Sequence, residues 1–216
     1  KLNYGGSFIP VKLNDGFGKT PAYAASVAAV LGLIFGMNLV KISEALVNYR
    51  SPAGRLTLIK GIKQSNIIDD TYNASPLAMR EALETLKRLK AKRKIAVFGD
   101  MLEIGKYTMQ AHEEIGHFAS KVIDILITVG TRAKFIAEGA AKFGMSKKSI
   151  FQFDDVNKAG IFLQDKIQKG DLILIKGSQG VRMEKIVEEV MAEPQRAEEL
   201  LVRQTPVWKK RKGIYE

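Results

Sequence analysis

The chain has 216 residues, of which 46% are hydrophobic, and carries a formal net charge of +11. This length and composition suffice for one or two domains with a real core. The absence of cysteine excludes disulfides and thiolate metal sites in this chain, and it suits a cytoplasmic protein. The basic excess fits either a solvated surface, partly in residues 209–212, or attraction to anionic ligands such as nucleotides, and charge alone leaves both open.

The first 53 residues predict the end of a domain. A strand-like run at residues 7–13 precedes an expected turn at Asn14-Asp15-Gly16 and an Ala-rich apolar stretch at residues 22–40. Small and polar residues interrupt this stretch, so we expect a buried helix and no membrane insertion. A second helix is expected at residues 41–48, and Ser51-Pro52-Ala53-Gly54 ends the pattern. Since the first residue is lysine and not methionine, we expect a fragment or a processed product. No signal-peptide pattern is present at the amino terminus.

From residue 55 onward, strands and helices alternate. Apolar and β-branched runs predict strands at residues 56–62, 66–70, 94–98, 125–129, 150–153 and 172–175. Ser75-Pro76 supplies a helix N-cap and first turn, and a second apolar helical face runs from Met183 to Met191. The alternation predicts an α/β fold with a mostly parallel, Rossmann-like sheet and helices on both faces. The tight link at residues 62–65 predicts an antiparallel hairpin between the first two strands.

Three segments follow from these patterns: residues 1–53, a sheet domain at residues 54–193, and a helical, basic tail at residues 194–216. In open sheets of this kind, ligands bind at the carboxyl ends of the strands. Polar residues follow four of the predicted strands, at Asp70-Thr71-Tyr72-Asn73, Gly99-Asp100-Met101, Gly130-Thr131 and Lys176-Gly177-Ser178.

The strongest of these signals is the segment that runs from Asp69 to Pro76. A carboxylate such as Asp70 can accept hydrogen bonds from ribose hydroxyls. Tyr72 offers a ring face, and the Asn73 amide can read the edge of a base. The alternative is a turn that only caps its own helix, because Asp, Asn and Ser all favour such turns.

Three other patterns carry no site. Gly18-Lys19-Thr20 resembles part of a phosphate loop, but Leu13 occupies the position where that loop requires glycine. His112 and His117 are five residues apart and do not share a helix face, so we expect ordinary helix residues. Asp154-Asp155 is expected to cap the helix that follows it. No spacing typical of metal ligands is present.

Four motifs occur in order and at suitable intervals. They are Gly54-Arg55, the run DDTYNASP from residue 69, the run FGDMLEIG from residue 98, and Lys176-Gly177-Ser178 followed by MEKIV. Together they resemble the carboxyl-terminal domain of the Mur ligase family, in particular the branch that adds D-alanyl-D-alanine. The likeness covers residues 54–190 and extends more weakly over residues 18–48. It implies a Rossmann-like domain preceded by the tail of a central P-loop-type ATPase domain.

The resemblance also implies an activity. The family uses ATP and magnesium to join an amino acid or dipeptide to a cell-wall precursor through an acyl phosphate. For this branch, the implied substrates are UDP-N-acetylmuramoyl-tripeptide and D-alanyl-D-alanine. The phosphate loop and the metal ligands are expected outside this chain, so we expect the chain alone to be inactive. A monomer that binds no nucleic acid is expected.

Residue by residue, the likeness assigns Arg55 to the ATP phosphates. A guanidinium fork suits that charge and can stabilise the charge that develops during phosphoryl transfer. The likeness further implies nucleotide contacts by Asp70, Tyr72 and Asn73, and substrate contacts by Lys176 and Ser178.

Rival interpretations stay open. A sister ligase, which adds another amino acid or adds glutamate to folate, shares the fold, although Tyr72-Asn73 and the GDMLEIG run argue against it. A non-enzymatic α/β module that binds a nucleotide is a second alternative. A basic nucleic-acid-binding protein is a third, but no recognition motif or aromatic platform supports it.

Overall fold

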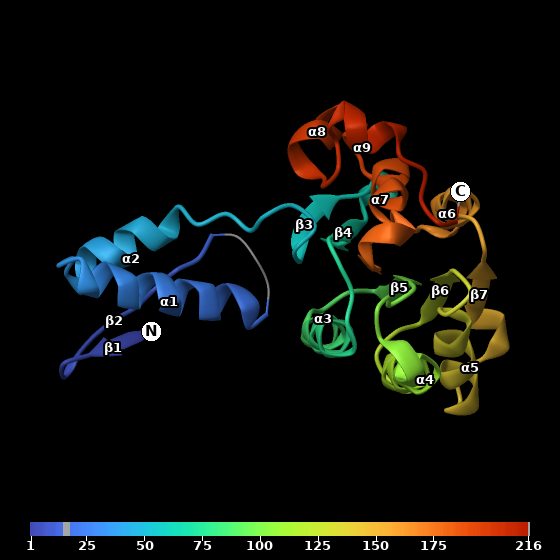
Figure 1. The fold of residues 1–216 in the computed structure, drawn as a ribbon, viewed down its shortest axis with the longest axis horizontal. Coiled ribbons are helices and arrows are strands. Elements are labelled where there is room, and N and C mark those ends of the chain that lie inside the picture. The colour runs from blue at the N-terminus through green and yellow to red at the C-terminus, as the bar shows by residue number, and fades with distance from the viewer. Residues whose placement is uncertain (15–17, 216) are drawn as a thin grey trace. The chain divides into compact units, whose positions relative to one another are not determined.

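The computed structural model describes residues 1–14 and 18–215, and the chain divides into two compact units, Lys1–Pro52 and Ala53–Glu216 (Figure 1). The turn expected at Asn14-Asp15-Gly16 falls for its last two residues outside the described part.

The first unit contains a hairpin and two helices: β1 (Leu2–Tyr4), β2 (Ser7–Ile9), α1 (Thr20–Ile34) and α2 (Leu39–Val47). Sequence analysis predicted only one strand here. Gly5 and Gly6 connect the two strands with φ values of +54° and +77°, which glycine adopts at little cost in a two-residue hairpin turn. The prediction of a single strand was therefore wrong, and the Gly-Gly pair was the signal for the second.

The Ala-rich helix α1 is buried on one side only. Ala25 and Ala29 pack with Ile42 and Leu46 of α2 in a small core. The remaining apolar residues of α1 are largely exposed, with Ile34 at 71%. The expectation of a buried helix was thus wrong for most of its surface. No helix in the described part of the chain has the length and apolar character needed to cross a bilayer.

The second unit is built on a six-stranded sheet. Its strands are β3 (Thr57–Lys60), β4 (Asn66–Asp70), β5 (Arg93–Gly99), β6 (Ile125–Val129), β7 (Ile150–Phe153) and β8 (Asp171–Lys176). The spatial order is β3-β4-β8-β5-β6-β7. Only β3 and β4 pair in antiparallel fashion, and every other neighbouring pair is parallel. The predicted hairpin and mostly parallel sheet are confirmed.

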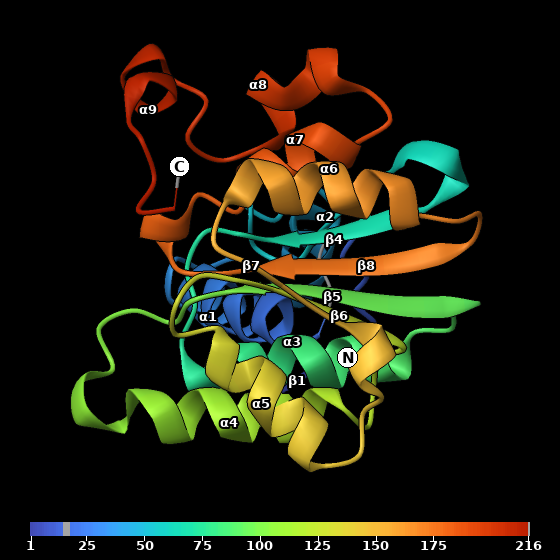
Figure 2. The same ribbon diagram turned by 90° about the vertical axis from the view of Figure 1, so that its right-hand side faces the viewer.

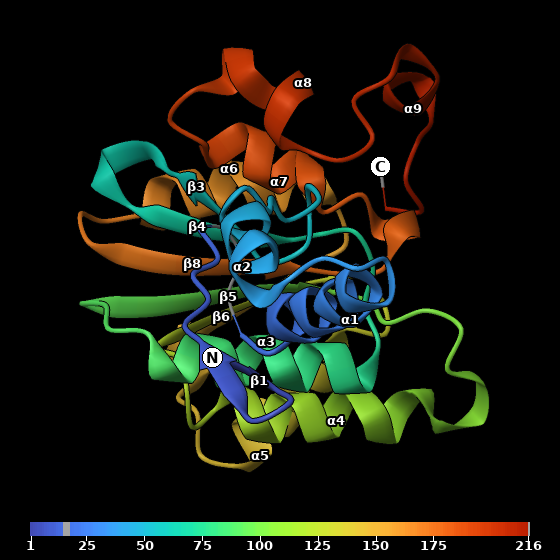
Figure 3. The same cartoon turned by 90° about the vertical axis from the view of Figure 1, so that its left-hand side faces the viewer.

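Helices cover both faces of this sheet, as predicted (Figure 2). One face carries α3 (Pro76–Arg88), α4 (Thr108–Ala119) and α5 (Lys134–Lys142), and the other carries α6 (Val156–Lys166) and α7 (Glu184–Val190). Two short helices, α8 (Ala197–Leu200) and α9 (Pro206–Lys210), lie beyond α6 and α7 (Figure 3). Helix α3 begins where predicted, because the Ser75 hydroxyl accepts a hydrogen bond from the Ala78 N–H.

The core explains why the strands read as continuous apolar runs. Ile67, Val97 and Ile127 pack with residues of α6 and α7, whereas the next residue along each strand points to the opposite face. These next residues are also fully buried, as at Ile68 and Phe98. Each such aliphatic side chain contributes about 1.5–3 kcal/mol by leaving water.

The carboxyl-terminal segment is integrated into the second unit. Ala197 and Leu201 are buried in the core cluster beside α6 and α7, and Tyr215 packs against the same cluster. Although the sequence sets residues 194–216 apart as a basic tail, the described part of that segment shares the core of the sheet domain.

Candidate functional site

The carboxyl ends of five parallel strands meet at one edge of the sheet. The order β4-β8-β5-β6 makes neighbours of the segments that follow Asp70, Lys176, Gly99 and Val129. Register pairs Asp70 directly with Lys176 and Lys176 with Phe98. Polar residues that are far apart in the sequence are therefore brought together at this edge, as the fold predicts.

Asp70 and Lys176 form a buried ion pair at this edge. The Lys176 Nζ lies 2.6 Å from Asp70 Oδ2, and both side chains are nearly enclosed. Burial raises the pKa of Asp70, and the adjacent Lys176 ammonium opposes that rise. The second Asp70 oxygen accepts the backbone N–H of Leu56, the residue after Arg55. Lys176 also donates to the Asn73 carbonyl oxygen at 2.9 Å.

Arg55, Tyr72 and Asn73 stand exposed around that pair. The Arg55 guanidinium carbon lies 4.1 Å from the centre of the Tyr72 ring, which is a cation–π contact. Tyr72 is 43% exposed, and Asn73 accepts the Ala74 N–H through its side-chain oxygen. Gly54 permits this approach, because at φ +70° it hydrogen-bonds the Tyr72 N–H and a Cβ there would lie only 3.0 Å from that nitrogen.

Asp69 has a structural role in the turn after β4. Its side chain is fully buried, and Oδ1 accepts both the hydroxyl and the backbone N–H of Thr71. Burial raises the pKa of Asp69 to about 6, against which the Thr71 hydrogen bonds act. Oδ2 has no hydrogen-bond partner. Of the two adjacent aspartates, Asp69 therefore shapes the turn after β4, whereas Asp70 meets the other strand ends.

Asp100 organises the ends of β5 and β6, a role that sequence reasoning missed. Its Oδ1 accepts the backbone N–H groups of Arg132 and Ala133, and its Oδ2 accepts the Tyr215 hydroxyl at 2.6 Å. Gly130, at φ +113°, leaves room for this carboxylate, because a Cβ would lie 2.6 Å from Oδ1. The available signal was the Gly-Asp pair at a strand end, which gave no hint of Tyr215.

A second missed cluster joins Arg182, Glu184 and Arg203. Glu184 is 1% exposed and forms ion pairs with both arginines, whose side chains are 4% and 5% exposed. Arg203 also donates to the carbonyl oxygens of Thr71 and Tyr72. Burial lowers the pKa of Arg203, and the Glu184 carboxylate opposes this effect. The cluster therefore ties the carboxyl-terminal segment to the turn after β4.

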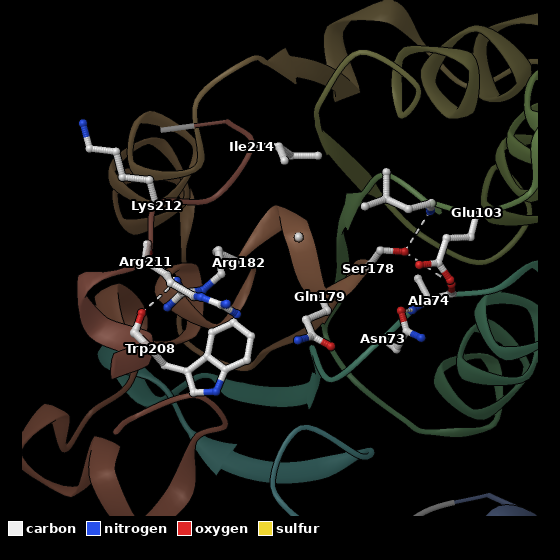
Figure 4. A pocket seen from close by; sticks show the side chains of 12 residues that line it. Asn73, Ala74, Glu103, Ser178, Gln179, Arg182, Trp208, Arg211, Lys212 and Ile214 are labelled. Carbon is white, nitrogen blue, oxygen red and sulfur yellow. Dashed lines mark hydrogen bonds between the residues drawn. The ribbon is translucent and has the colours of Figure 1, made fainter. Parts of the chain in front are cut away.

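Ser178 lies at the wall of a cavity of about 630 Å³ beside these groups (Figure 4). The Ser178 hydroxyl accepts the Leu102 N–H at 2.8 Å and donates to the Ala74 carbonyl oxygen, so it joins three strand-end loops. Lys176 does not line this cavity. The lining residues are Asn73, Ala74, Leu102, Glu103, Ser178, Gln179, Gly180, Arg182, Trp208, Arg211, Lys212 and Ile214.

The three patterns set aside from the sequence behave as structural features. Thr20 begins α1, and Lys19 is the N-cap residue of that helix. His112 accepts the Met101 N–H and bonds the Thr108 carbonyl oxygen, and burial lowers its pKa. Asp155 caps α6 by accepting the Lys158 N–H at 2.8 Å, as predicted.

The fold and the polar edge define a Rossmann-like α/β domain that binds its ligands at the strand ends. Residues 54–179 match a family model described as Mur ligase, glutamate ligase domain. The chain is 34% identical over 189 residues to UDP-N-acetylmuramoyl-tripeptide–D-alanyl-D-alanine ligase of Bacillus subtilis. The aligned residues cover 87% of this chain and 40% of that relative.

Solved structures also include proteins that are similar to this chain. A MurF ligase from Thermotoga maritima in complex with ADP is similar at a TM-score of 0.72 and 29% identity, over 85% of this chain and 40% of the other. A folylpolyglutamate synthase from Mycobacterium tuberculosis, at a TM-score of 0.57 and 17% identity over 78% of this chain and 39% of the other, shares the fold alone. The chain belongs to the Mur ligase family. It spans about 40% of the length of the curated relative from Bacillus subtilis.

Proposed function

We propose that this chain is the carboxyl-terminal part of a cytosolic, ATP-dependent ligase that joins D-alanyl-D-alanine to UDP-N-acetylmuramoyl-tripeptide. Two relatives of that name share 34% and 35% identity with it. The observation that carries the proposal is the strand-end edge, where Arg55, Tyr72 and Asn73 are exposed beside the cavity wall formed by Ser178.

The reaction of the whole enzyme has two steps. The terminal carboxylate of the tripeptide takes the γ-phosphoryl group of ATP, which gives an acyl phosphate and ADP. The amine of D-alanyl-D-alanine then attacks the acyl carbon, an amide bond forms, and phosphate leaves as the amine loses a proton. Such transfers depend on positioning and charge stabilisation more than on covalent chemistry by the protein.

In this proposal the nucleotide is contacted by Arg55, Tyr72, Asn73 and Asp70. The guanidinium of Arg55 can approach the transferred phosphate, because Arg55 is exposed and no salt bridge is recorded for it within residues 18–215. Tyr72 and Asn73 present a ring face and an amide, respectively. Asp70 keeps lone pairs beyond those used by Lys176 and Leu56, since an ionised carboxylate accepts about four hydrogen bonds, and these can receive ribose hydroxyls.

Ser178 and Lys176 contribute differently to the substrate side. Ser178 faces the cavity and holds the loops around it. Lys176 is 2% exposed, and its ammonium contacts Asp70 and Asn73, so it acts by fixing these two residues. Lys176 therefore affects the substrate indirectly, by holding Asp70 and Asn73 in position.

Magnesium requires ligands from elsewhere. Within residues 1–14 and 18–215 no group of three or more His, Asp or Glu side chains is placed to hold a metal ion. Asp70 is paired and Asp69 is enclosed, which does not fit a hydrated magnesium ion. When bound in the whole enzyme, the ion would neutralise phosphate charge.

The test uses the protein as its gene encodes it. ADP release is measured in three parallel reactions, each with ATP and UDP-N-acetylmuramoyl-tripeptide. The amine in the three reactions is D-alanyl-D-alanine, L-glutamate or meso-diaminopimelate. We expect turnover only with the dipeptide. Turnover with another amino acid would reassign the chain to a sister ligase, and nucleotide binding without any turnover would favour a non-enzymatic module. The 216-residue chain by itself should release no phosphate from ATP with both substrates present.

A further inference from the structure

The amino-terminal ends of the parallel strands, opposite the proposed site, carry a dense positive charge. The first residues of β8, β5, β6 and β7 are neighbours in parallel register, so the segments that precede these strands meet at one end of the second unit. The links from α3 to β5 and from α6 to β8 both lie at this end (right-hand side of Figure 2). Lysine and arginine are frequent in all of these segments.

Six of the eight residues from 87 to 94, in the run that joins α3 to β5, are basic. Two of the six are engaged within the fold. Arg93 pairs with Asp171 at 2.6 Å. The Lys94 ammonium donates to the carbonyl oxygen of residue 87. The other four are exposed, and no ion pair is recorded for them within the described residues. They are Lys87, Arg88, Lys90 and Lys92.

Three neighbouring segments add to this charge. Lys121 lies between α4 and β6, and Lys169 lies between α6 and β8. Lys147 and Lys148 precede β7. All four side chains are exposed. Together with the four exposed cations of residues 87–92, they form the surface that we call the basic edge.

The carboxylates at this end of the sheet give little compensation. Asp171 is buried and paired with Arg93. Asp124 uses one oxygen to accept the Lys94 N–H at 2.7 Å. Even with Asp165, which is exposed in the last turn of α6, cations outnumber carboxylates at this end. The basic edge therefore presents a net positive charge to its surroundings.

Helix stability accounts for only part of this charge. A helix dipole favours cations in the last turn, and Lys87 and Arg88 occupy the last turn of α3. This effect falls off within one turn. Lys92, Lys148 and Lys169 lie outside the α-helices, within two residues of the starts of β5, β7 and β8. The dipole therefore does not explain their charge.

From this arrangement we infer that the second unit docks through its basic edge onto an anionic lipid surface. Each lysine or arginine held near such a surface strengthens binding by about fivefold, so eight exposed cations suffice for reversible attachment. Strand β5 spans seven residues, which places the proposed site roughly 20 Å from the basic edge. The docked protein therefore keeps its ligand-binding edge in solution. The inference does not depend on the proposed function.

Lipid fits the basic edge better than nucleic acid does. All of its cations except Arg88 are lysines, which are hydrated point charges without the planar fork by which arginine recognises phosphates and bases. They extend from four separate segments and so cover a surface, whereas readout of a duplex places one helix or β-ribbon in a groove. Phe143, at the end of α5, is 48% exposed and stacks on His117. An exposed aromatic ring near lysines is typical of surfaces that lie at a bilayer interface.

The first experiment measures cosedimentation of the 216-residue chain with vesicles at about 0.1 M salt. The vesicles contain phosphatidylcholine alone, or phosphatidylcholine with about one third phosphatidylglycerol. We expect binding to the anionic vesicles only, and at least about tenfold weaker binding at about 0.5 M salt, which screens surface charges. Absence of binding, or equal binding to both kinds of vesicle, would overturn the inference. A DNA duplex of about 20 base pairs that displaces the chain from the vesicles at equal phosphate concentration would also overturn it, in favour of nucleic acid.

The second experiment neutralises part of the basic edge. The quadruple variant Lys87→Gln, Arg88→Gln, Lys90→Gln and Lys92→Gln should bind anionic vesicles at least about 100-fold more weakly than the parent chain, because four charge contacts are lost. The matched control removes four positive charges from exposed lysines outside the basic edge, and its binding should fall at most about threefold. It carries Lys106→Gln, Lys134→Gln, Lys158→Gln and Lys210→Gln.

Two single variants keep the test decisive if the quadruple variant does not fold. Lys90→Gln and Lys169→Gln change exposed loop residues, and each should weaken binding to anionic vesicles about fivefold. Urea unfolding of each variant verifies the fold. Equal losses in the quadruple variant and the matched control, or parental binding in both single variants, would show that total charge and not the basic edge governs attachment, and would refute the inference.

Discussion

Among residues outside the proposed site, Glu184 is the one whose substitution we expect to lower the free energy of unfolding most. It neutralises two buried guanidinium groups, Arg182 and Arg203, and its own side chain is 1% exposed. Glu184→Gln keeps the shape of the side chain and removes its charge. Both arginines then stay buried without a counter-charge. Breaking a buried pair in this way costs about 3–5 kcal/mol, because the desolvation of the remaining charge is no longer offset.

The size of the effect on melting follows from the size of the unit. For a domain of about 150–250 residues, each 1 kcal/mol lowers the Tm by about 2–4 °C, so Glu184→Gln should lower it by roughly 6–20 °C. Urea unfolding gives the free energy directly. Glu199→Gln is the matched control, since Glu199 pairs with Arg196 at 64% exposure and should cause no resolvable change.

The triad can also be removed as a whole. Because buried ion pairs are often neutral relative to well-packed apolar residues, Arg182→Met with Glu184→Leu and Arg203→Met should recover much of the stability lost in Glu184→Gln. Recovery will be incomplete, since Arg203 also satisfies the carbonyl oxygens of Thr71 and Tyr72. A Glu184→Gln protein that unfolds at the same urea concentration as the parent would refute the view that this carboxylate compensates two buried charges.

Three further predictions concern the strand-end edge. The pKa of Asp69 is raised from 3.8 to about 6, so the native state binds more protons than the unfolded state between about pH 4 and 6, and its contribution to unfolding free energy falls by about 2–3 kcal/mol as pH rises through that window. Asp69→Asn should remove this component, seen as the difference between the urea midpoints of variant and parent at each pH, and identical profiles would contradict it. In the protein as its gene encodes it, Arg55→Ala should lower kcat by about 10²–10³-fold with little change in Tm, and Arg55→Lys should rescue poorly, because a point charge cannot replace the planar fork; near-parental turnover would exclude Arg55 from the site. Tyr215→Phe should destabilise the second unit by about 1 kcal/mol, measured by urea unfolding, because Asp100 and Thr131 lose a hydrogen-bond partner, and an unchanged midpoint would show that the carboxyl-terminal segment is not held there.

The sheet was predictable because its strands are covered on both faces. The strands at residues 66–70, 125–129 and 150–153 were predicted with the bounds that the structure has. The strands β4 and β6 are buried over most of their length and form apolar runs that the composition reveals, whereas β7 at the sheet edge is only half-buried. The pair β1–β2 lacks that signal, since none of its residues is buried, and only its Gly-Gly turn distinguishes it from a loop.

Polar partnerships were far less predictable. Tyr215 bonds Asp100 across 115 positions, and Arg203 reaches Thr71 across 132. Hydrophobic periodicity says which face of an element is buried, but it carries no information on which polar groups meet once the elements pack. The basic composition of residues 209–212 indicated a solvated tail. Leu201 and Tyr215, which lie on either side of this run, pack with the core, but two apolar residues are too few to show a hydrophobic periodicity.

The structure separates the charged groups of this edge into two kinds. Asp70 with Lys176, and Glu184 with its two arginines, are buried and mutually compensated, so their charges hold the loops in register, and Asp70 can offer a ligand the lone pairs that these contacts leave over. Arg55, Glu103 and Lys212 are exposed, and none is recorded in an ion pair within the described residues. A charge that a protein fixes in position and leaves without a partner can lower the free energy of a bound ligand with little reorganisation. Function at this edge is therefore sought among the uncompensated charges, and the compensated pairs explain why those charges stand where they do.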